Sequence, residues 1–142
     1  MRILAVDPGE KRLGIALSDP SGTIASPLLI LEHVSRTIDA ATIADLAAQH
    51  EVIRIIIGQS LDMENHPTPQ GRRAARLAAA IQLQTDLPVE LWDEWGSTLA
   101  ARSVHISLGG SARQRRQRGH GHLDDLAATY ILQSYLDSHT RS

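Results

Sequence analysis

The chain has 142 residues, of which 42% are hydrophobic and 21% charged, and its net charge is −2. These values are typical of a soluble globular protein, and we expect residues 1–142 to form a single domain with its own core. The absence of cysteine excludes disulfides and thiolate zinc sites, and an aromatic content of 3% excludes base stacking as the main mode of nucleic-acid binding. No signal-peptide pattern or membrane-spanning run is present, which favours a cytoplasmic protein.

The first third of the chain predicts an antiparallel meander of three strands. Residues 2–7 and 12–18 are short apolar stretches joined by a turn at Pro8-Gly9. A third strand is expected within residues 22–33. Pro27 inside it favours an edge position or a bulge, because proline cannot donate to a central hydrogen-bond ladder.

Two helices and two strands are predicted to follow. A helix over residues 35–50 has Ser35 as its N-cap, and residues 52–58 are almost continuously β-branched and apolar, which is typical of a buried parallel strand. A second helix is expected over residues 72–85 and a short strand over 87–92. The predicted buried faces are Ile38, Ala41, Leu46 and Ala47 in the first helix, and Ala74, Leu77, Ala78 and Ile81 in the second.

The last part of the chain predicts a helix over residues 98–110, a basic loop over 111–122 and a final helix over 123–137. The complete order predicts an α/β fold: a mixed sheet with helices on both faces. The carboxyl ends of its parallel strands then share one edge, where ligands bind in open α/β sheets. The apolar stripe expected in the final helix is Leu123, Leu126, Ala127, Tyr130, Ile131 and Ser134.

Acidic residues fall at three places along this predicted edge. Asp7 ends the first strand, the pair Asp93-Glu94 follows the last strand, and the pair Asp124-Asp125 begins the final helix. Converging carboxylates repel one another unless a divalent cation lies between them, and such hard oxygen ligands suit Mg²⁺ or Mn²⁺. Two such ions can activate a water and stabilise the leaving oxygen of a phosphodiester. Taken singly, each acid could equally cap a turn or a helix.

Basic residues gather in two clusters. The helix over 72–85 begins with Arg72, Arg73 and Arg76, which we interpret as its solvated face. The loop over 111–122 holds four more arginines. A local basic patch on a nearly neutral protein is typical of a nucleic-acid footprint, and a solvated loop explains this second cluster equally well.

Five stretches together resemble a known family: VDPGEKRLGIALSD, GTIASPL, IIIGQSLDMEN, VELWDEWGST and HLDDLAATYILQSYLD. In this order and spacing they resemble the YqgF (RuvX) family of bacterial RNase H-like nucleases over nearly the whole chain. The resemblance implies an RNase H-like fold with the first strand at the centre of a five-stranded sheet. It also implies a cytoplasmic nuclease with a role in 5′-end maturation of pre-16S ribosomal RNA, in a family earlier treated as Holliday-junction resolvases.

The resemblance also implies the site residues. The aspartate of the family's D-x-G motif falls on Asp7, and the glutamate of its D-E-R motif falls on Glu94. The aspartate three residues before the Ala-Ala pair falls on Asp124, with Asp125 as a neighbouring alternative. Asp7, Glu94 and Asp124 would then be both catalytic residues and ligands of Mg²⁺ or Mn²⁺. The arginine of the D-E-R motif is Trp95 here, which leaves a substrate contact at that position open.

The leading hypothesis is a divalent-metal-dependent nuclease that leaves a 5′-phosphate and a 3′-hydroxyl. A resolvase-like DNA endonuclease and a non-catalytic RNA-binding ribosome-assembly module are the alternatives. The partner would be structured RNA or branched DNA, bound by a monomer or a homodimer. The opening stretch also resembles the phosphate loop of actin-like ATPases and sugar kinases, but those enzymes close two domains around ATP. The basic residues expected to bind phosphates are Lys11, Arg12, Arg113, Arg115, Arg116 and Arg118.

Overall fold

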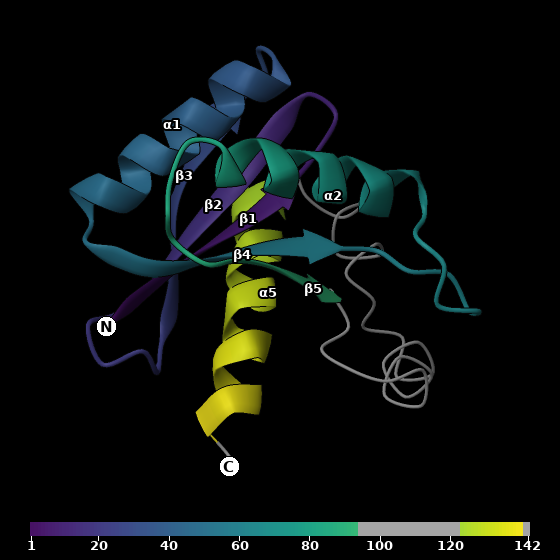
Figure 1. Ribbon diagram of the computed structural model, residues 1–142. Helices are drawn as coiled ribbons and strands as arrows, with labels where there is room; N and C mark the ends of the chain where they lie inside the picture. The colour runs from purple at the N-terminus through teal and green to yellow at the C-terminus, as the bar shows by residue number, and fades with distance from the viewer. Residues whose placement is uncertain (94–122, 141–142) are drawn as a thin grey trace.

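A five-stranded sheet forms the centre of the computed structural model, which describes residues 1–93 and 123–140 (Figure 1). The strand order is β3-β2-β1-β4-β5. The first three strands form an antiparallel meander, and β4 and β5 both run parallel to β1. The predicted mixed sheet with the first strand at its centre is therefore confirmed. The strands are β1 (Arg2–Pro8), β2 (Arg12–Ser18), β3 (Ala25–Glu32), β4 (Val52–Gln59) and β5 (Val89–Asp93).

Three helices cover the two faces of the sheet. Helices α1 (Arg36–Gln49) and α2 (Pro69–Gln82) pack on one face, and α5 (Leu123–Thr140) packs on the other (Figure 1). One core cluster joins Leu4 and Val6 of β1 to side chains of α1 and α2. The second joins Ala5 of β1 to side chains of α5. The central strand is therefore buried on both faces, as a continuous apolar run predicts.

The predictions for the individual strands are confirmed. β4 has three consecutive fully buried isoleucines, because it lies between β1 and β5 with helices on both sides. β3 is an edge strand, and Pro27 pairs with Ala16 next to a register shift in β2. The edge position and the shift together accommodate the residue that lacks an N–H group.

The predicted helix faces are correct for α2 and partly wrong elsewhere. All four residues predicted for α2 are buried, and the helix begins at Pro69 because the Thr68 hydroxyl accepts a hydrogen bond from the Gly71 N–H. In α1, Ser35 is the N-cap as predicted, but Ile38 is 50% exposed and Ile43 is buried instead. Apolar residues lie on more than one side of α1, so packing on the sheet selects the buried side.

The predicted stripe of α5 is also displaced. Leu126 is 55% exposed, although it belonged to the predicted face. The helix is apolar around most of its circumference, and the sheet selects a stripe that includes the small residues 127 and 128. The buried residues of α5 are Ala127, Ala128, Ile131, Leu132, Tyr135 and Leu136.

The predicted helix over 98–110 and the basic loop over 111–122 lie outside the described residues. Within the described ranges, no helix combines the length and the apolar character that crossing a membrane requires.

Candidate active site

Asp7 is the acidic residue at the carboxyl end of the central strand. Its side chain is buried, with 5% of the residue exposed. Leu4 and Val6 belong to the core beneath α1 and α2, whereas Ala5 belongs to the core beneath α5. Side chains alternate along a strand, so Asp7 is directed to the α5 face. A carboxylate is costly to bury there without compensation, which sets this position apart from the rest of the core.

The carboxyl end of β5 lies at the same edge of the sheet. Val6 pairs with Ile57 of β4, and two residues further along β4, Gln59 pairs with Asp93. With β4 between them, the backbones of β1 and β5 are two strand spacings apart, or about 10 Å. Asp93 is thus placed at the predicted edge with Asp7. Glu94, the predicted ligand, follows directly and lies outside the described residues.

Helix α5 approaches this edge closely because β4 has a glycine there. A Cβ atom built on Gly58 would lie 2.4 Å from the Cδ1 atom of Ile131. Since Ile131 is 1% exposed, its side chain has little room to move away. Glycine at this position therefore sets the distance between α5 and the end of β4.

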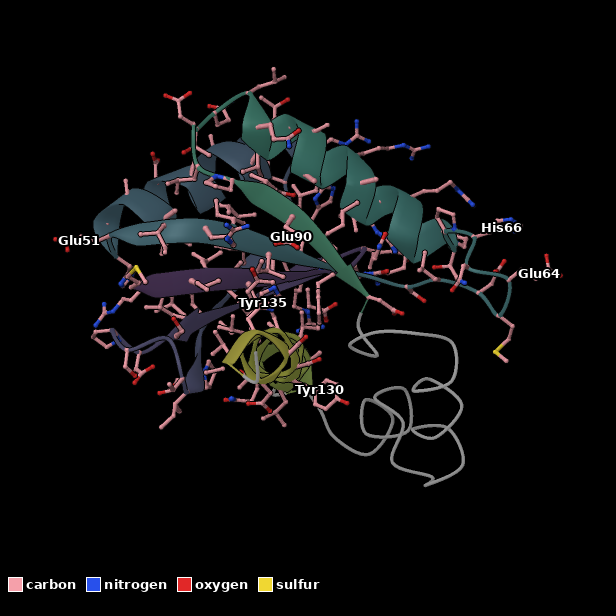
Figure 2. The ribbon with its side chains drawn as sticks, turned by 60° about the horizontal axis from the view of Figure 1, so that its bottom comes forward. Glu51, Glu64, His66, Glu90, Tyr130 and Tyr135 are labelled. Carbon is pink, nitrogen blue, oxygen red and sulfur yellow. The ribbon has the colours of Figure 1, made fainter. Side chains whose placement is uncertain are left out.

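The direction of α5 brings its first residues toward the same edge. One turn beyond Ile131, the Tyr135 hydroxyl donates a hydrogen bond to Glu90 Oε2 over 3.2 Å, near the start of β5 (Figure 2). Tyr135 therefore lies near the start of the parallel strands, and Ile131, one turn closer to the N-terminus of α5, lies nearer their carboxyl ends. The backbone of Asp124, about two turns earlier, continues toward the edge at Asp7. The side chain of Asp124 lies outside the described residues.

A polar and aromatic cluster links α5 to β5. Glu90 accepts from both Tyr135 and Arg54, the latter over 3.1 Å. The Trp92 ring lies edge-on to Tyr135 with centroids 5.2 Å apart, and its Nε1 donates to Ser134 Oγ over 3.3 Å. Burial, together with the Glu90 carboxylate, raises the pKa of Tyr135 above its ordinary value of 10.0. Tyr135 therefore stays neutral and acts as a donor at physiological pH.

The opposite side of α5 is held by the loop between β2 and β3. The side-chain amide of Gln133 accepts from the Ala25 N–H and donates to the Thr23 carbonyl oxygen, each over 2.9 Å. Asp19 organises this loop by accepting from the Ser21 hydroxyl over 2.6 Å and from the Ile24 N–H over 3.1 Å. These hydrogen bonds lower the pKa of the Asp19 carboxyl well below its ordinary value.

The described part of the chain contains only some of the predicted site residues. Lys11 and Arg12 are exposed in and just after the turn that follows Asp7. The four arginines of the loop over 111–122 lie outside the described residues, as does Glu94. Within the described ranges, no three histidine, aspartate or glutamate side chains come together as a metal site would require. The ligand set Asp7, Glu94 and Asp124 therefore stays a prediction.

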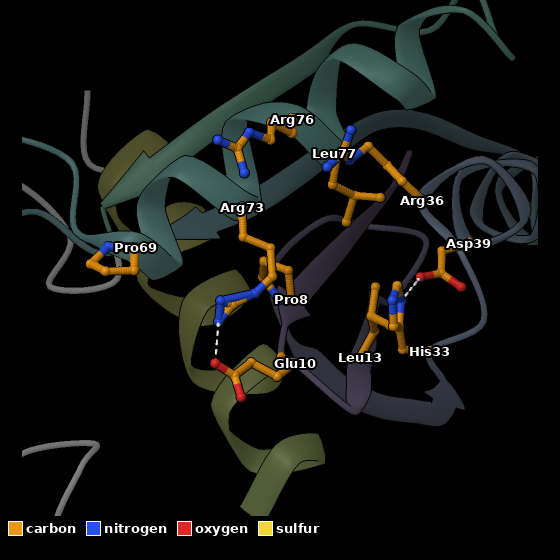
Figure 3. A pocket seen from close by; sticks show the side chains of 11 residues that line it. Pro8, Glu10, Leu13, His33, Arg36, Asp39, Pro69, Arg73, Arg76 and Leu77 are labelled. Atoms are coloured by element: carbon orange, nitrogen blue, oxygen red, sulfur yellow. Dashed lines mark hydrogen bonds and ion pairs between the residues drawn. The ribbon is translucent and has the colours of Figure 1, made fainter.

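The sequence did not predict that arginines from two helices share a pocket next to this edge. Arg72 and Arg76 are exposed, as the interpretation of a solvated helix face expects. Arg73 and Arg76, however, line a pocket of about 420 Å³ together with Arg36 of α1 (Figure 3). The spacing of residues 73 and 76 was a signal for a shared helix face. Arg36 could not be added to them without the fold, because it lies 37 positions before Arg73 in the chain.

Family and sequence comparisons fit this arrangement. The family model RuvX, described as Holliday junction resolvase, matches residues 1–138. The chain belongs to the RuvX family. A Thermoanaerobacter pseudethanolicus protein is 37% identical over 138 residues, covering 97% of each chain, and a Moorella thermoacetica protein is 36% identical over 137 residues, covering 96% of this chain and 95% of the relative. Both relatives are named "Putative pre-16S rRNA nuclease".

Solved structures of two resolvases share the fold. RuvC from Thermus thermophilus, in complex with a Holliday junction, superposes with a TM-score of 0.56 at 13% identity and covers 99% of this chain and 96% of its own. The fowlpox virus Holliday junction resolvase gives a TM-score of 0.53 at 15% identity and covers 97% and 99%. The predicted RNase H-like architecture is therefore confirmed.

Proposed function

We propose that this RuvX-family chain is a divalent-metal-dependent nuclease that hydrolyses phosphodiester bonds in RNA, in 5′-end maturation of pre-16S ribosomal RNA. The activity would reside in one RNase H-like domain over residues 1–142 of a cytoplasmic protein. The relatives named as pre-16S rRNA nucleases, which match over nearly their whole length, support this substrate.

The buried carboxylate of Asp7 is the observation that carries the proposal. It lies near the end of the central strand, at the edge where β5 also ends and which the N-terminal end of α5 approaches. A divalent cation at this edge would supply positive charge to a carboxylate that is buried on the face that packs against α5.

The donor set fits Mg²⁺ or Mn²⁺. Asp7, Glu94 and Asp124 would supply carboxylate oxygens, which are the ligands that these hard cations prefer. When bound, the cation would activate a water and stabilise the leaving oxygen of the phosphodiester. Asp7 belongs to the central strand, and Asp124 belongs to the first turn of α5.

The basic residues near the edge would bind the substrate backbone. Lys11 and Arg12 are exposed beside Asp7, where they can reach a phosphate without desolvating their charge. Arg113, Arg115, Arg116 and Arg118 would add phosphate contacts from the preceding loop. The described residues have few exposed aromatic rings, which agrees with recognition through phosphates rather than stacked bases.

Cleavage of branched DNA is the second candidate function. The family description and the titles of the two solved relatives name Holliday junction resolvases. A resolvase makes paired cuts and would act as a homodimer, whereas an RNA-processing nuclease could act as a monomer. A non-catalytic RNA-binding module on the same fold would bind RNA without turnover.

A cleavage panel separates these functions. Single-stranded RNA, a pre-16S ribosomal RNA fragment and a four-way DNA junction are each incubated with Mg²⁺, Mn²⁺ or EDTA. The proposal predicts cleavage of the ribosomal precursor with a metal ion and none with EDTA. Preferential cutting of the junction selects the resolvase, and RNA binding without cleavage under every condition selects the non-catalytic module.

The Asp7→Asn variant tests the role of the carboxylate. We expect loss of metal-dependent cleavage, because the amide is a poorer ligand for a hard cation. We also expect the metal-free variant to remain folded, because the amide has nearly the same size and shape as the carboxylate. The exposed Asp45→Asn variant on α1 is the matched control and retains activity. Full cleavage by Asp7→Asn contradicts the assignment.

A further inference from the structure

An arginine-lined pocket lies beside the predicted active site, on the face of the sheet covered by α1 and α2. It is bounded by Pro8 and Gly9 at the end of β1, by Arg36 in the first turn of α1, and by Arg73 and Arg76 of α2 (Figure 3). Its volume of about 420 Å³ is large enough for a phosphate group with part of a sugar. Two helices distant in sequence thus bring three guanidinium groups to one cavity.

Arg73 contributes an unsatisfied donor to this pocket. Its side chain is 33% exposed, and its Nε atom is buried without an acceptor in the described part of the structure. Its Nη2 atom lies 3.9 Å from Glu10 Oε1, but the Glu10 side chain is 83% exposed and free to move aside. A buried N–H group without an acceptor is rare in folded proteins and favours a ligand that supplies the acceptor.

The other charges in the pocket leave an excess of positive charge. Arg36 and Arg76 are exposed and form no ion pair or hydrogen bond among the described residues. Asp39, the buried carboxylate of the pocket wall, is already occupied: it accepts from the Val34 N–H over 3.1 Å and contacts His33 Nδ1 at 2.5 Å. Besides Asp39, the described residues that line the pocket thus include three arginines and one other carboxylate, the exposed Glu10. Planar guanidinium groups are well suited to binding phosphate, because two N–H groups match two oxygens.

The pocket is adjacent to Asp7 but on the other face of the sheet. Pro8, the residue after Asp7, lines the pocket, whereas the alternation of β1 directs Asp7 toward α5. A nucleic-acid strand with its scissile phosphate at Asp7 would cross the end of β1, and a flanking phosphate would reach the pocket. Its walls include Leu13, Leu77 and Pro69. Among the described lining residues, His33, which contacts Asp39, has the only aromatic ring, so the pocket offers little aromatic surface for stacking a base.

We infer that Arg36, Arg73 and Arg76 form a subsite for a backbone phosphate that flanks the cleaved bond. This inference rests on the proposed nuclease function, because it places the subsite relative to Asp7. The subsite reads no base sequence, since phosphate contacts position a strand without specifying it. It would fix the register of the substrate on the sheet edge.

Binding measured without cleavage tests the subsite. Fluorescence anisotropy follows a labelled single-stranded fragment of pre-16S ribosomal RNA in EDTA, for the wild type and for the double variant Arg73→Gln/Arg76→Gln. Arg36→Gln gives a second test from a different helix, and Arg72→Gln, outside the pocket on α2, is the matched control. Circular dichroism and thermal unfolding verify that each variant is folded.

We expect the double variant to bind about tenfold more weakly or worse, because a charged hydrogen bond is lost. The slope of log affinity against log salt concentration should fall by about 0.7 for each phosphate contact removed. Arg36→Gln should weaken binding in the same direction, and Arg72→Gln should match the wild type. Unchanged affinity and salt slope in both pocket variants overturn the inference.

Two further outcomes distinguish the phosphate subsite from a small-anion site and from the nuclease proposal itself. If inorganic phosphate or a mononucleotide raises the unfolding temperature of the wild type while the pocket variants bind RNA normally, the pocket serves a small anion and the inference is wrong. If the wild type fails to cleave RNA with Mg²⁺ or Mn²⁺, the nuclease proposal fails. The anisotropy results do not depend on that second outcome.

Discussion

The Gly58→Ala substitution offers the sharpest test of how α5 is positioned. The added Cβ would lie 2.4 Å from Ile131 Cδ1 and 3.2 Å from Ile131 Cγ1. Ordinary carbon contacts begin at about 3.5 Å, so the closer pair is short by about 1.1 Å. Such overpacking costs about 1–3 kcal/mol. Restricting the unfolded chain offsets about 0.5–1 kcal/mol of this, which leaves a net loss of up to about 2.5 kcal/mol.

The double variant Gly58→Ala/Ile131→Val isolates the clash. Ile131→Val alone should cost about 0.5–1.5 kcal/mol, because it removes a buried methyl group. It also removes Cδ1, the atom nearest to the new Cβ, so the double variant should be less destabilised than the sum by roughly 1 kcal/mol. Ile43→Val, in the core on the opposite face, is the matched control and should combine additively with Gly58→Ala.

Urea unfolding followed by circular dichroism measures all of these free energies. If Gly58→Ala and Ile131→Val add to within about 0.3 kcal/mol, the two positions are not coupled and the reasoning is refuted. The cleavage rate of Gly58→Ala gives a functional readout. It should fall although the variant remains folded, because a displaced α5 moves Asp124 relative to Asp7.

Two further predictions concern pH. The raised pKa of Tyr135 means that the folded state holds the phenol proton more tightly than the unfolded state, so stability is complete below pH 10 and falls above it. Tyr135→Phe should flatten this loss in melting curves between pH 9 and 11, and parallel curves would contradict the prediction. The lowered pKa of Asp19 means that its contribution is present above its ordinary pKa of 3.8 and is lost as the pH falls below it. Asp19→Asn should therefore lower the melting temperature at pH 7 more than at pH 3, and an equal loss at both would contradict this.

Much of the sheet could be predicted because its strands differ so clearly in burial. The β-branched run over 52–58 is apolar at nearly every position, as a strand covered on both faces must be, and Pro27 excludes a central position for β3. The face of α5 could not be predicted in the same way. Its apolar residues surround the helix, so nothing in the pattern distinguishes Ala128 from the exposed Leu126.

A candidate residue could be identified from the sequence where its own position in a strand was informative. A cluster formed by residues from different elements could not. An acid at the end of an apolar strand singled out Asp7 without any structure. Gly58 carried a weaker signal, since a glycine inside a strand often marks a close approach by another element. The pocket of Arg36, Arg73 and Arg76 had no local signal at all. It exists because α1 and α2 pack side by side on the same face of the sheet.

The central claim is that Asp7, Glu94 and Asp124 share a divalent cation. Crystals of the full chain grown with Mn²⁺ and recorded at a wavelength where manganese scatters anomalously test it most directly. The account predicts an anomalous peak within ligand distance, about 2.0–2.3 Å, of carboxylate oxygens from all three residues. No peak at Asp7, or a peak there with the side chains of residues 94 and 124 turned away, would contradict the claim.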